Sequence, residues 1–242
     1  MDHALSVLVP ALNEERDLEA TVRQLIRIVG SVCEDFEIII VNDGSTDRTG
    51  DVATQLARTQ PRVRVLENPR NMGLGYSYAR GVREARKTHF VYVPGDNTWP
   101  EDSIGEILRH MGKADVVTSY ATNPEVRVGF RRVISTAYTT TLNALFGLRM
   151  RYFNGLSVYP RRFLLTRPVT TWGFGFQAET LLKAIDAGLS VVEVGVPIDE
   201  AAARRSRALS LRNFLSVAKT VITTFWALRV ARRRMPASVG QP

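Results

Sequence analysis

Residues 36–47 read FEIIIVNDGSTD, and this stretch decides the fold. Its first part, Phe36–Val41, is a run of apolar, mostly β-branched residues, which is typical of a strand buried on both faces. The polar turn residues Asn42–Asp47 follow at once, and the apolar spacing after them predicts a helix over Thr49–Ala57. A buried strand that runs through a polar turn into a helix is the repeating unit of a parallel α/β sheet.

The same unit recurs on both sides of this stretch. Short apolar runs predict further strands at Ser6–Pro10, Arg62–Leu66, Phe90–Val93 and Asp115–Ser119. Apolar residues at helical spacing predict helices at Asn13–Val29, Tyr76–Arg86 and Asp102–Met111. The second half is less regular, with helices expected at Phe130–Phe146 and Gln177–Ala187 and strands at Gly155–Tyr159 and Ser190–Val196. The sequence thus predicts an α/β fold in which helices flank a mostly parallel sheet.

Polar and glycine-rich clusters follow the predicted strands of the first half. The clusters are Ala11–Glu14, Asn42–Asp47, Asn71–Gly75 and Gly95–Thr98. Open α/β sheets bind ligands at the carboxyl ends of their strands, so these clusters predict one binding edge. The candidate acids there are Asp43, Asp47 and Asp96, and carboxylate oxygens suit Mg²⁺ or Mn²⁺ beside a diphosphate. For Asp43 the alternative is a purely structural role in the turn that begins a helix.

The composition is that of an ordinary globular chain with one domain, or one domain and an appendage. The 242 residues are 45% hydrophobic and 23% charged, which excludes a disordered or collagen-like chain. Cys33 is the one cysteine and the three histidines are scattered, so neither a disulfide nor a Cys/His zinc site is expected. The glycines of Gly73-x-Gly75 do not follow a strand in the dinucleotide-binding pattern, so NAD binding is not expected.

The positive charge is concentrated at the C-terminal end. The net charge is +8, and residues 201–242 contain nine basic residues and no acidic one. Such a tail favours an anionic surface or ligand. Nucleic acid is not an expected partner, because no platform of basic and aromatic residues accompanies the tail. The N-terminus lacks the pattern of a signal peptide and no uncharged apolar run is long enough to span a bilayer, so we expect a cytoplasmic protein.

Seven segments of the chain carry a family resemblance. They are SVLVPALNEERDLEATV, IIIVNDGSTDRTGDVA, NPRNMGLGYSYARGVREA, VYVPGDNTWPED, RRVIS, FGFQAETLLKAIDAGLSVVEVGVPI and SRALSLRNF. In order and spacing they resemble the inverting glycosyltransferases of family 2, in particular the dolichol-phosphate mannose synthase and polyprenyl-phosphate glycosyltransferase branch. The resemblance implies a GT-A type nucleotide-sugar-binding fold over residues 1–210, with a nucleotide-binding half (1–120) and an acceptor half (121–210).

The resemblance implies a donor site for a nucleotide sugar, such as GDP-mannose or a UDP-hexose, at the strand ends. Its nucleotide-binding residues would be Pro10, Ala11, Asn13, Glu14, Asp43, Gly73, Gly75 and Asp96. Asp96 matches the second acid of the family's D-x-D metal motif, while Pro94 replaces the first. One carboxylate with diphosphate oxygens would hold Mg²⁺ or Mn²⁺ more weakly, which leaves metal dependence open. Thr98 stands where relatives often carry a glutamine and would be a minor metal ligand.

The resemblance also implies an acceptor that carries a phosphate, a polyprenyl or dolichyl phosphate. Such an acceptor is already anionic, so it needs cationic side chains rather than a general base. The candidate arginines are Arg127, Arg131, Arg132, Arg204, Arg205 and Arg207. Arg131 matches a family arginine four residues before a serine, here Ser135, and is a candidate catalytic residue. Ser206-Arg207 resembles the family's Ser-Lys pair, which assigns Arg207 to phosphate binding. Arg204 is assigned the same role, with Arg205 as the alternative, because the family's spacing just before the pair is shortened here.

Glu179 is the third candidate catalytic residue, beside Asp96 and Arg131. With Gln177 it matches the family's F-[EQ]-x-E segment. The resemblance implies that Glu179 orders the acceptor site or acts as a base. The alternative is a structural carboxylate at the start of a helix.

A basic amphipathic helix and tail are expected over residues 211–242. The helix, at Leu211–Leu228, has an apolar face opposite a basic and polar one, which is typical of a helix on a membrane surface. We therefore expect a peripheral position on the inner face of the membrane. The alternatives are that this face packs on the domain's own core or on the second subunit of a homodimer. Two other functions also stay open: a soluble family 2 enzyme with a small-molecule acceptor, and a nucleotide-sugar-binding module without turnover.

Overall fold

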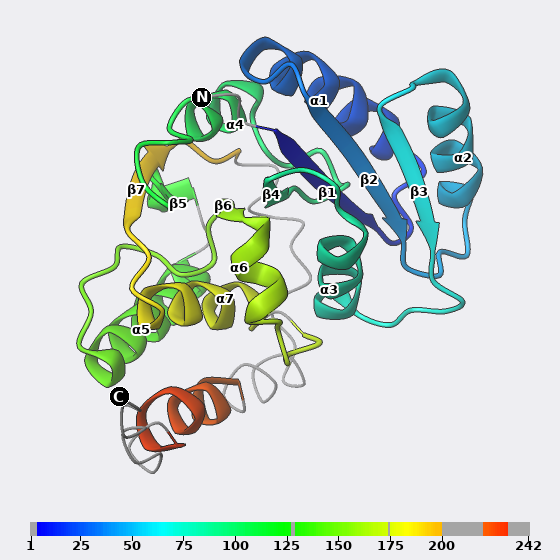
Figure 1. The fold of residues 1–242 in the computed structure, drawn as a ribbon. Helices are drawn as coiled ribbons and strands as arrows, with labels where there is room; N and C mark the ends of the chain where they lie inside the picture. The colour runs from blue at the N-terminus through cyan, green and yellow to red at the C-terminus, as the bar shows by residue number, and fades with distance from the viewer. Residues whose placement is uncertain (1–3, 127–128, 174, 200–219, 232–242) are drawn as a thin grey trace, which may run out of the picture.

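Strands and helices alternate along most of the chain, and two consecutive helices precede the last strand (Figure 1). The computed structural model describes residues 4–126, 129–173, 175–199 and 220–231. The strands are β1 (Leu5–Ala11), β2 (Phe36–Asn42), β3 (Val63–Glu67), β4 (His89–Tyr92), β5 (Val116–Ala121), β6 (Ser157–Pro160) and β7 (Val191–Val196). The main helices are α1 (Leu18–Val32), α2 (Thr49–Thr59), α3 (Leu74–Glu84), α4 (Glu101–Leu108), α5 (Gly129–Phe146), α6 (Arg161–Thr166) and α7 (Phe176–Asp186). A short 3₁₀ helix, Pro124–Val126, precedes α5, and residues 220–231 form a last helix that is π-helical over Trp226–Ala231.

The seven strands form one sheet in the order β3-β2-β1-β4-β6-β5-β7. Strand β6 pairs antiparallel with both β4 and β5, and the other pairings are parallel. In the centre, Leu8 of β1 pairs with Ile39 of β2 on one side and with Tyr92 of β4 on the other. This confirms the predicted mostly parallel sheet flanked by helices. It also brings the carboxyl ends of β1, β2, β4 and β5 to one edge.

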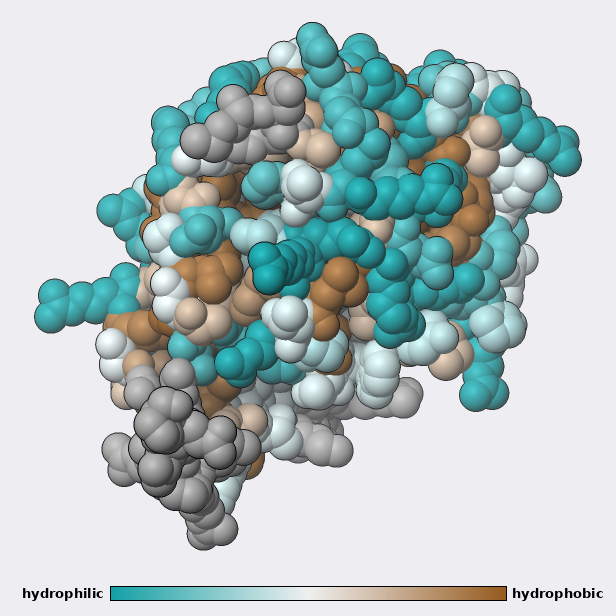
Figure 2. Space-filling model, in the orientation of Figure 1, coloured by the Kyte–Doolittle hydropathy of each residue, from teal (hydrophilic) through white to brown (hydrophobic). Residues whose placement is uncertain are grey.

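Helices cover both faces of the sheet and enclose two apolar layers. Helices α1, α2 and α4 pack on one face, where Leu25 and Ile107 meet Val7 of β1. Helices α3, α5, α6 and α7 pack on the other face, where Val82 and Leu181 belong to the same cluster as Leu8. Strands β1 and β2 are buried along their whole length, because their side chains are apolar on both faces. The view in Figure 2 shows a mostly hydrophilic outer surface with smaller apolar patches.

Three elements differ from the sequence-based expectation. Helix α1 begins at Leu18 rather than at Asn13, because residues 12–17 form a turn in which Asn13 has a φ of 59°. Helix α6 was not predicted, since its six residues directly after β6 are too few to display a helical period. Strand β6 is antiparallel to both of its neighbours, and the composition of a short strand does not reveal its direction.

Residues 220–231 contain part of the predicted C-terminal helix, whose residues 211–219 lie outside the described residues. The side chains that are buried or pack against the α3–α7 layer are those of Thr220, Val221, Thr224, Phe225 and Leu228. Of the predicted apolar face, Val221 and Phe225 therefore pack on the domain itself, the first alternative to a membrane contact, whereas Ile222 does not. The side chains of Ile222 and Trp226 are instead 60% and 55% exposed to solvent. Among the described helices, none has the length and apolar character needed to cross a membrane.

Candidate active site

The turn after β1 is tied to the loop after β2. Asn13 accepts a hydrogen bond from Thr46 N at its Oδ1 (2.9 Å), and its own N–H donates to Ser45 Oγ (3.0 Å). The Glu14 N–H donates to Thr49 Oγ1 at the start of α2 (2.8 Å). The predicted nucleotide-binding residues of this turn therefore lie directly against the polar cluster of the second strand.

Pro10 and Ala11 lie inside β1, and their backbone joins the next two strand ends. The Pro10 carbonyl accepts a hydrogen bond from Gly95 N (3.2 Å), in the loop after β4. The Ala11 carbonyl accepts one from Asp43 N (2.9 Å), directly after β2. The structure thus brings the clusters of β1, β2 and β4 together at one edge of the sheet.

Asp43 is a buried carboxylate that holds the loop before α3. It is 5% exposed. Its Oδ1 accepts hydrogen bonds from Asn68 Nδ2 (2.7 Å) and Met72 N (2.9 Å), and its Oδ2 accepts one from Gly73 N (3.0 Å). The first residue of α2, Thr49, donates its N–H to Asp47 instead (2.9 Å), so Asp47 and not Asp43 is bound to the start of that helix.

Gly73 directly precedes α3 and Gly75 is its second residue, and both are covered by residues that precede α7. A Cβ at Gly75 would lie 2.0 Å from the Thr171 carbonyl oxygen, and one at Gly73 would lie 2.9 Å from the Trp172 carbonyl oxygen. The Gly75 N–H also donates to that Trp172 oxygen (2.9 Å). This close approach explains both glycines without a nucleotide, so their spacing alone does not identify a nucleotide contact.

Asp96 is half-buried in the loop after β4, beside the end of β1. Its Oδ1 accepts a hydrogen bond from Thr98 Oγ1 (2.7 Å), and Asn97 between them has a φ of 51°. In the described parts of the chain, no group of three or more Asp, Glu, His or Cys side chains could hold a metal ion. Mg²⁺ in nucleotide-binding enzymes is commonly held by one or two carboxylates together with substrate phosphates. Asp96 and Thr98 therefore fit a divalent ion that binds together with a diphosphate.

Glu179, in the first turn of α7, is 1% exposed. Its Oε1 accepts hydrogen bonds from Thr170 N and Oγ1 (both 2.8 Å) and from Lys183 Nζ (2.5 Å), and its Oε2 accepts one from Thr171 N (3.0 Å). Burial raises the pKa of Glu179, but the hydrogen bonds from Lys183 and Thr171 outweigh burial and leave this pKa below its ordinary value of 4.5. A buried carboxylate with these donors is a poor proton acceptor, so the geometry supports the structural alternative.

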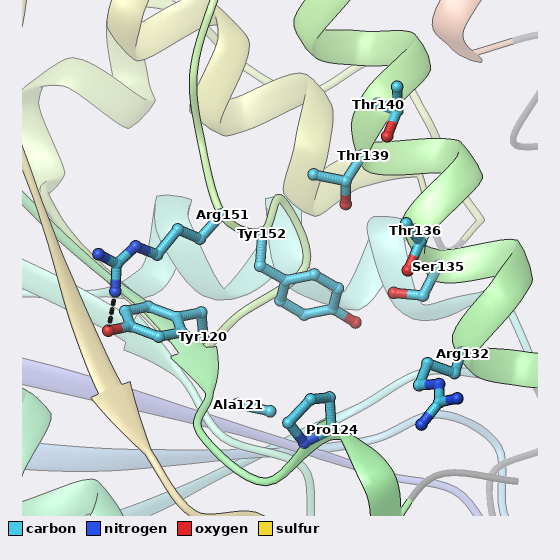
Figure 3. A pocket seen from close by; sticks show the side chains of 10 residues that line it. All are labelled: Tyr120, Ala121, Pro124, Arg132, Ser135, Thr136, Thr139, Thr140, Arg151 and Tyr152. Atoms are coloured by element: carbon cyan, nitrogen blue, oxygen red, sulfur yellow. Dashed lines mark hydrogen bonds between the residues drawn. The ribbon is translucent and has the colours of Figure 1, made fainter. Parts of the chain in front are cut away.

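A cavity of about 220 Å³ opens at the end of β5 (Figure 3). Six hydroxyl-bearing side chains line it, those of Tyr120, Ser135, Thr136, Thr139, Thr140 and Tyr152. Arg132 and Arg151 line it as well, and none of the described lining residues is a carboxylate. Arg151 donates a hydrogen bond to the Tyr120 hydroxyl, while the Tyr152 hydroxyl points toward Ser135 (Figure 3). Cationic and hydroxyl groups without an acid suit an anionic polar ligand, such as a phosphate.

Among the predicted acceptor arginines, the structure places Arg132 at this cavity. Arg131 precedes it in α5, but the structure does not describe the Arg131 side chain. Outside the described residues lie Arg127, Arg204, Arg205 and Arg207, whose roles stay predictions. The hydroxyl groups of α5 were not singled out from the sequence. Their signal was present, since Ser135-Thr136 and Thr139-Thr140 are pairs four residues apart and so share one helix face.

Comparison with known proteins defines the class to which this fold and site belong. Residues 6–169 match the family described as Glycosyl transferase family 2, and the chain belongs to that family. Its fold is the GT-A glycosyltransferase fold. Glucosyl-3-phosphoglycerate synthase from Mycobacterium tuberculosis, solved with Mn²⁺, UDP and glucosyl-3-phosphoglycerate, matches it with a TM-score of 0.67 at 21% identity, over 98% of this chain and 82% of that one.

Several relatives match over most of the chain. Glycosyltransferase AglD of Haloferax volcanii is 27% identical over 239 residues, which are 95% of this chain and 38% of AglD. Polyprenol monophosphomannose synthase of Mycolicibacterium smegmatis is 28% identical over 207 residues, 80% of this chain and 77% of that protein. The chain thus spans less than half the length of AglD, and this is also true of two Bacillus subtilis relatives, at 26% and 44%.

Proposed function

We propose that this chain is a glycosyltransferase that moves a sugar from a nucleotide-sugar donor to a polyprenyl or dolichyl phosphate. The observation that carries the proposal is the position of three features on one edge of the sheet. Asp43 follows β2, Asp96 follows β4, and the cavity with Arg132 opens at the end of β5. A donor diphosphate and an anionic acceptor would meet above these strand ends. Membership of family 2 and the similarity to a polyprenol monophosphomannose synthase support the proposal.

On the donor side, the reaction breaks the bond between the sugar carbon and the diphosphate oxygen, whose electron pair stays on the nucleoside diphosphate. A bound Mg²⁺ or Mn²⁺ supplies Lewis-acid stabilisation of that charge. Asp96, with the Thr98 hydroxyl beside it, would hold the ion. Asp43 holds the Met72 and Gly73 N–H groups at the end of β2.

On the acceptor side, a phosphate oxygen of the lipid would form the new bond to the sugar carbon. A phosphate is ionised at neutral pH, so the step needs no general base. Arg132, and Arg131 beside it, would orient the phosphate through charge-assisted hydrogen bonds. This division of roles agrees with a Glu179 whose carboxylate is buried and already hydrogen-bonded.

A peripheral position on the inner face of a membrane is part of the proposal. On α5, Phe130 and Val133 are 69% and 64% exposed, and the last helix exposes Ile222 and Trp226. The two helices touch, since the rings of Phe146 and Phe225 lie 5.8 Å apart. Helices at a bilayer interface bury such side chains among the lipid headgroups.

The size of the cavity favours a second candidate, a soluble acceptor that carries a phosphate. The cavity volume of about 220 Å³ is below the ~300–1,000 Å³ typical of sites for drug-sized ligands. A lipid would place only its phosphate there, whereas a small phosphorylated molecule would be enclosed.

A nucleotide panel followed by a transfer assay tests these candidates. Thermal shifts with GDP, UDP and their sugar derivatives, with and without Mn²⁺, would identify the donor. Labelled donor would then be offered with a polyprenyl phosphate in detergent micelles or with glycerol 3-phosphate. Transfer to the lipid supports the main proposal, and transfer to glycerol 3-phosphate alone supports the second. Binding without transfer would indicate a module without turnover, and no shift with any nucleotide would overturn the donor site.

A further inference from the structure

The segment Val169–Gly173, which we call the strap, crosses the start of α3. Its carbonyl groups at Thr171 and Trp172 lie against Gly75 and Gly73, at positions where no Cβ would fit. The Trp172 ring lies 5.5 Å from the Tyr76 ring in the first turn of α3, and Trp172 is 52% exposed. The strap and the start of α3 are separated by about a hundred residues in the chain, so only tertiary contacts hold them together.

The strap is fixed from the other side by Glu179. The carboxylate accepts the N–H groups of two consecutive strap residues, Thr170 (2.8 Å) and Thr171 (3.0 Å), and the Thr170 hydroxyl as well. Lys183, one helical turn further along α7, donates to Glu179 (2.5 Å) and to the Pro168 carbonyl just before the strap (2.6 Å). Glu179 is thus the buried anchor of the strap on α7.

The start of α3 is held between the strap and the end of β2. Gly75 donates its N–H to the Trp172 carbonyl in the strap. On the other side, Met72 and Gly73 donate theirs to Asp43. A continuous set of hydrogen bonds therefore runs from Glu179 through the strap to the loop at Asp43.

We propose that Glu179 is a positioning residue of the donor site, which acts through the strap on residues 71–75. Movement of the strap would release Gly75 and change the position of the Met72 and Gly73 N–H groups beside Asp43. The strap also meets the last helix, since the hydroxyls of Thr171 and Thr220 lie 3.2 Å apart. The inference rests on the proposed function only in treating residues 71–75 as part of the donor site.

The first test is hydrogen exchange of the full chain, because it needs neither nucleotide nor activity. In Glu179→Gln the amide loses the charge that holds Lys183 and presents an NH₂ to one of its former donors. Amides of residues 169–173 and of residues 71–76 are both expected to exchange about tenfold faster than in the wild type. Lys183→Met removes the partner and keeps Glu179, and provides the same test if Glu179→Gln does not fold.

Glu37→Gln is the matched control. Glu37 is also a buried carboxylate, 6% exposed, with hydrogen bonds from Ser6 Oγ (2.7 Å), Arg86 N (2.6 Å) and Arg64 (2.8 Å). It lies near the start of β2, at the end of the strand opposite Asp43. Its loss is expected to destabilise the fold while leaving exchange of residues 71–76 relative to the rest of the chain unchanged.

The second test measures binding of UDP and GDP with Mg²⁺ at a temperature where each variant is folded. We expect Glu179→Gln to weaken binding about fivefold or more, and Glu37→Gln to leave it unchanged. Faster exchange in residues 169–173 with no change in residues 71–76 would overturn the inference, and so would unchanged nucleotide binding in a variant whose strap exchanges faster. A wild type that binds neither nucleotide overturns the proposed donor site instead, while the exchange data still decide whether Glu179 positions residues 71–76.

Discussion

The Oδ2 atom of Asp43 lies 3.0 Å from the backbone nitrogen of Gly73, which fixes the start of α3 to the end of β2. The same carboxylate accepts hydrogen bonds from Met72 N and from Asn68 Nδ2. Every partner described for it is a donor, so this buried position requires a side chain that only accepts. The loop before α3 therefore depends on a carboxylate for its shape before any ligand is bound.

Replacement of this carboxylate by an amide is expected to destabilise the protein. In Asp43→Asn the NH₂ group faces at least one N–H donor, so a buried hydrogen bond is lost. The free energy of unfolding should fall by about 1–3 kcal/mol, measured by urea denaturation. Asp51→Asn on α2, where the aspartate side chain is 78% exposed, is the control and should change stability by less than about 0.5 kcal/mol. Equal effects of the two substitutions would contradict this account of Asp43.

The proposed metal site at Asp96 predicts that a substitution there abolishes the dependence of nucleotide binding on a divalent ion. Asp96→Asn removes the negative charge that a divalent ion requires, so the thermal shift with UDP or GDP should become the same with and without Mg²⁺. Sugar transfer should fall about a hundredfold or more. Asp102→Asn, at an exposed position in the first turn of α4, is the matched control. An Asp96→Asn variant that keeps the wild-type response to Mg²⁺ would place the ion elsewhere.

The cavity at the end of β5 predicts a defect specific to the acceptor. Arg132→Ala removes a cationic side chain from a site whose described lining residues include no acid. The KM for a polyprenyl phosphate should rise about tenfold, because hydrogen bonds to charged groups contribute about 1.5–3 kcal/mol, while the KM for the donor should not change. Arg149→Ala, at an exposed position after α5, is the control. A rise in the donor KM instead would assign Arg132 to the donor side.

The first half of the fold could be predicted from the sequence because its elements are specified locally. Strand β2 is apolar on both faces, and Asn42–Asp47 after it are turn residues, so one stretch indicates strand, turn and binding edge together. The predicted start of α1 was wrong because the turn at Asn13 depends on a hydrogen bond from Thr46, in a loop thirty-three residues away. Strand β6 and α6 are short, and neither has enough residues to show direction or period.

The candidate site, too, could be predicted from the sequence only in part. Asp43 and Asp96 were singled out because they follow buried strands, and the structure brings their loops to one edge. The true surroundings of Gly75 and Glu179 were not predicted, since both depend on the strap, and no local pattern at Gly75 refers to Thr171. Long-range contacts between backbone groups leave no periodic signal in either partner.

The strap also predicts a large effect of one added methyl group. In Gly75→Ala the new Cβ would lie 2.0 Å from the Thr171 carbonyl oxygen, so the strap or α3 must move. Stability should fall by about 2 kcal/mol or more, measured by urea denaturation. Gly129→Ala at the start of α5 is the matched control, because its Cβ would meet no described residue within 4 Å, and it should be neutral or stabilising. A tolerated Gly75→Ala would show that the strap does not lie against α3 in solution.

The pKa of Glu179 predicts how its contribution to stability depends on pH. Hydrogen bonds from Lys183 and Thr171 overcome burial and lower the pKa of Glu179 in the folded protein below 4.5. A lowered pKa means that the ionised carboxylate stabilises the fold above the pKa of the unfolded chain, and that this stabilisation is lost as the pH falls through the lower pKa of the folded state.

The difference in unfolding free energy between the wild type and Glu179→Gln should therefore be constant from neutral pH down to about pH 5. It should shrink as the pH falls below 4.5, in urea titrations at each pH. A catalytic base that works near neutral pH would behave in the opposite way, because its raised pKa would make the ionised carboxylate destabilising. The wild type would then gain on the variant as the pH fell, and Glu179 would have to be returned to the list of candidate bases.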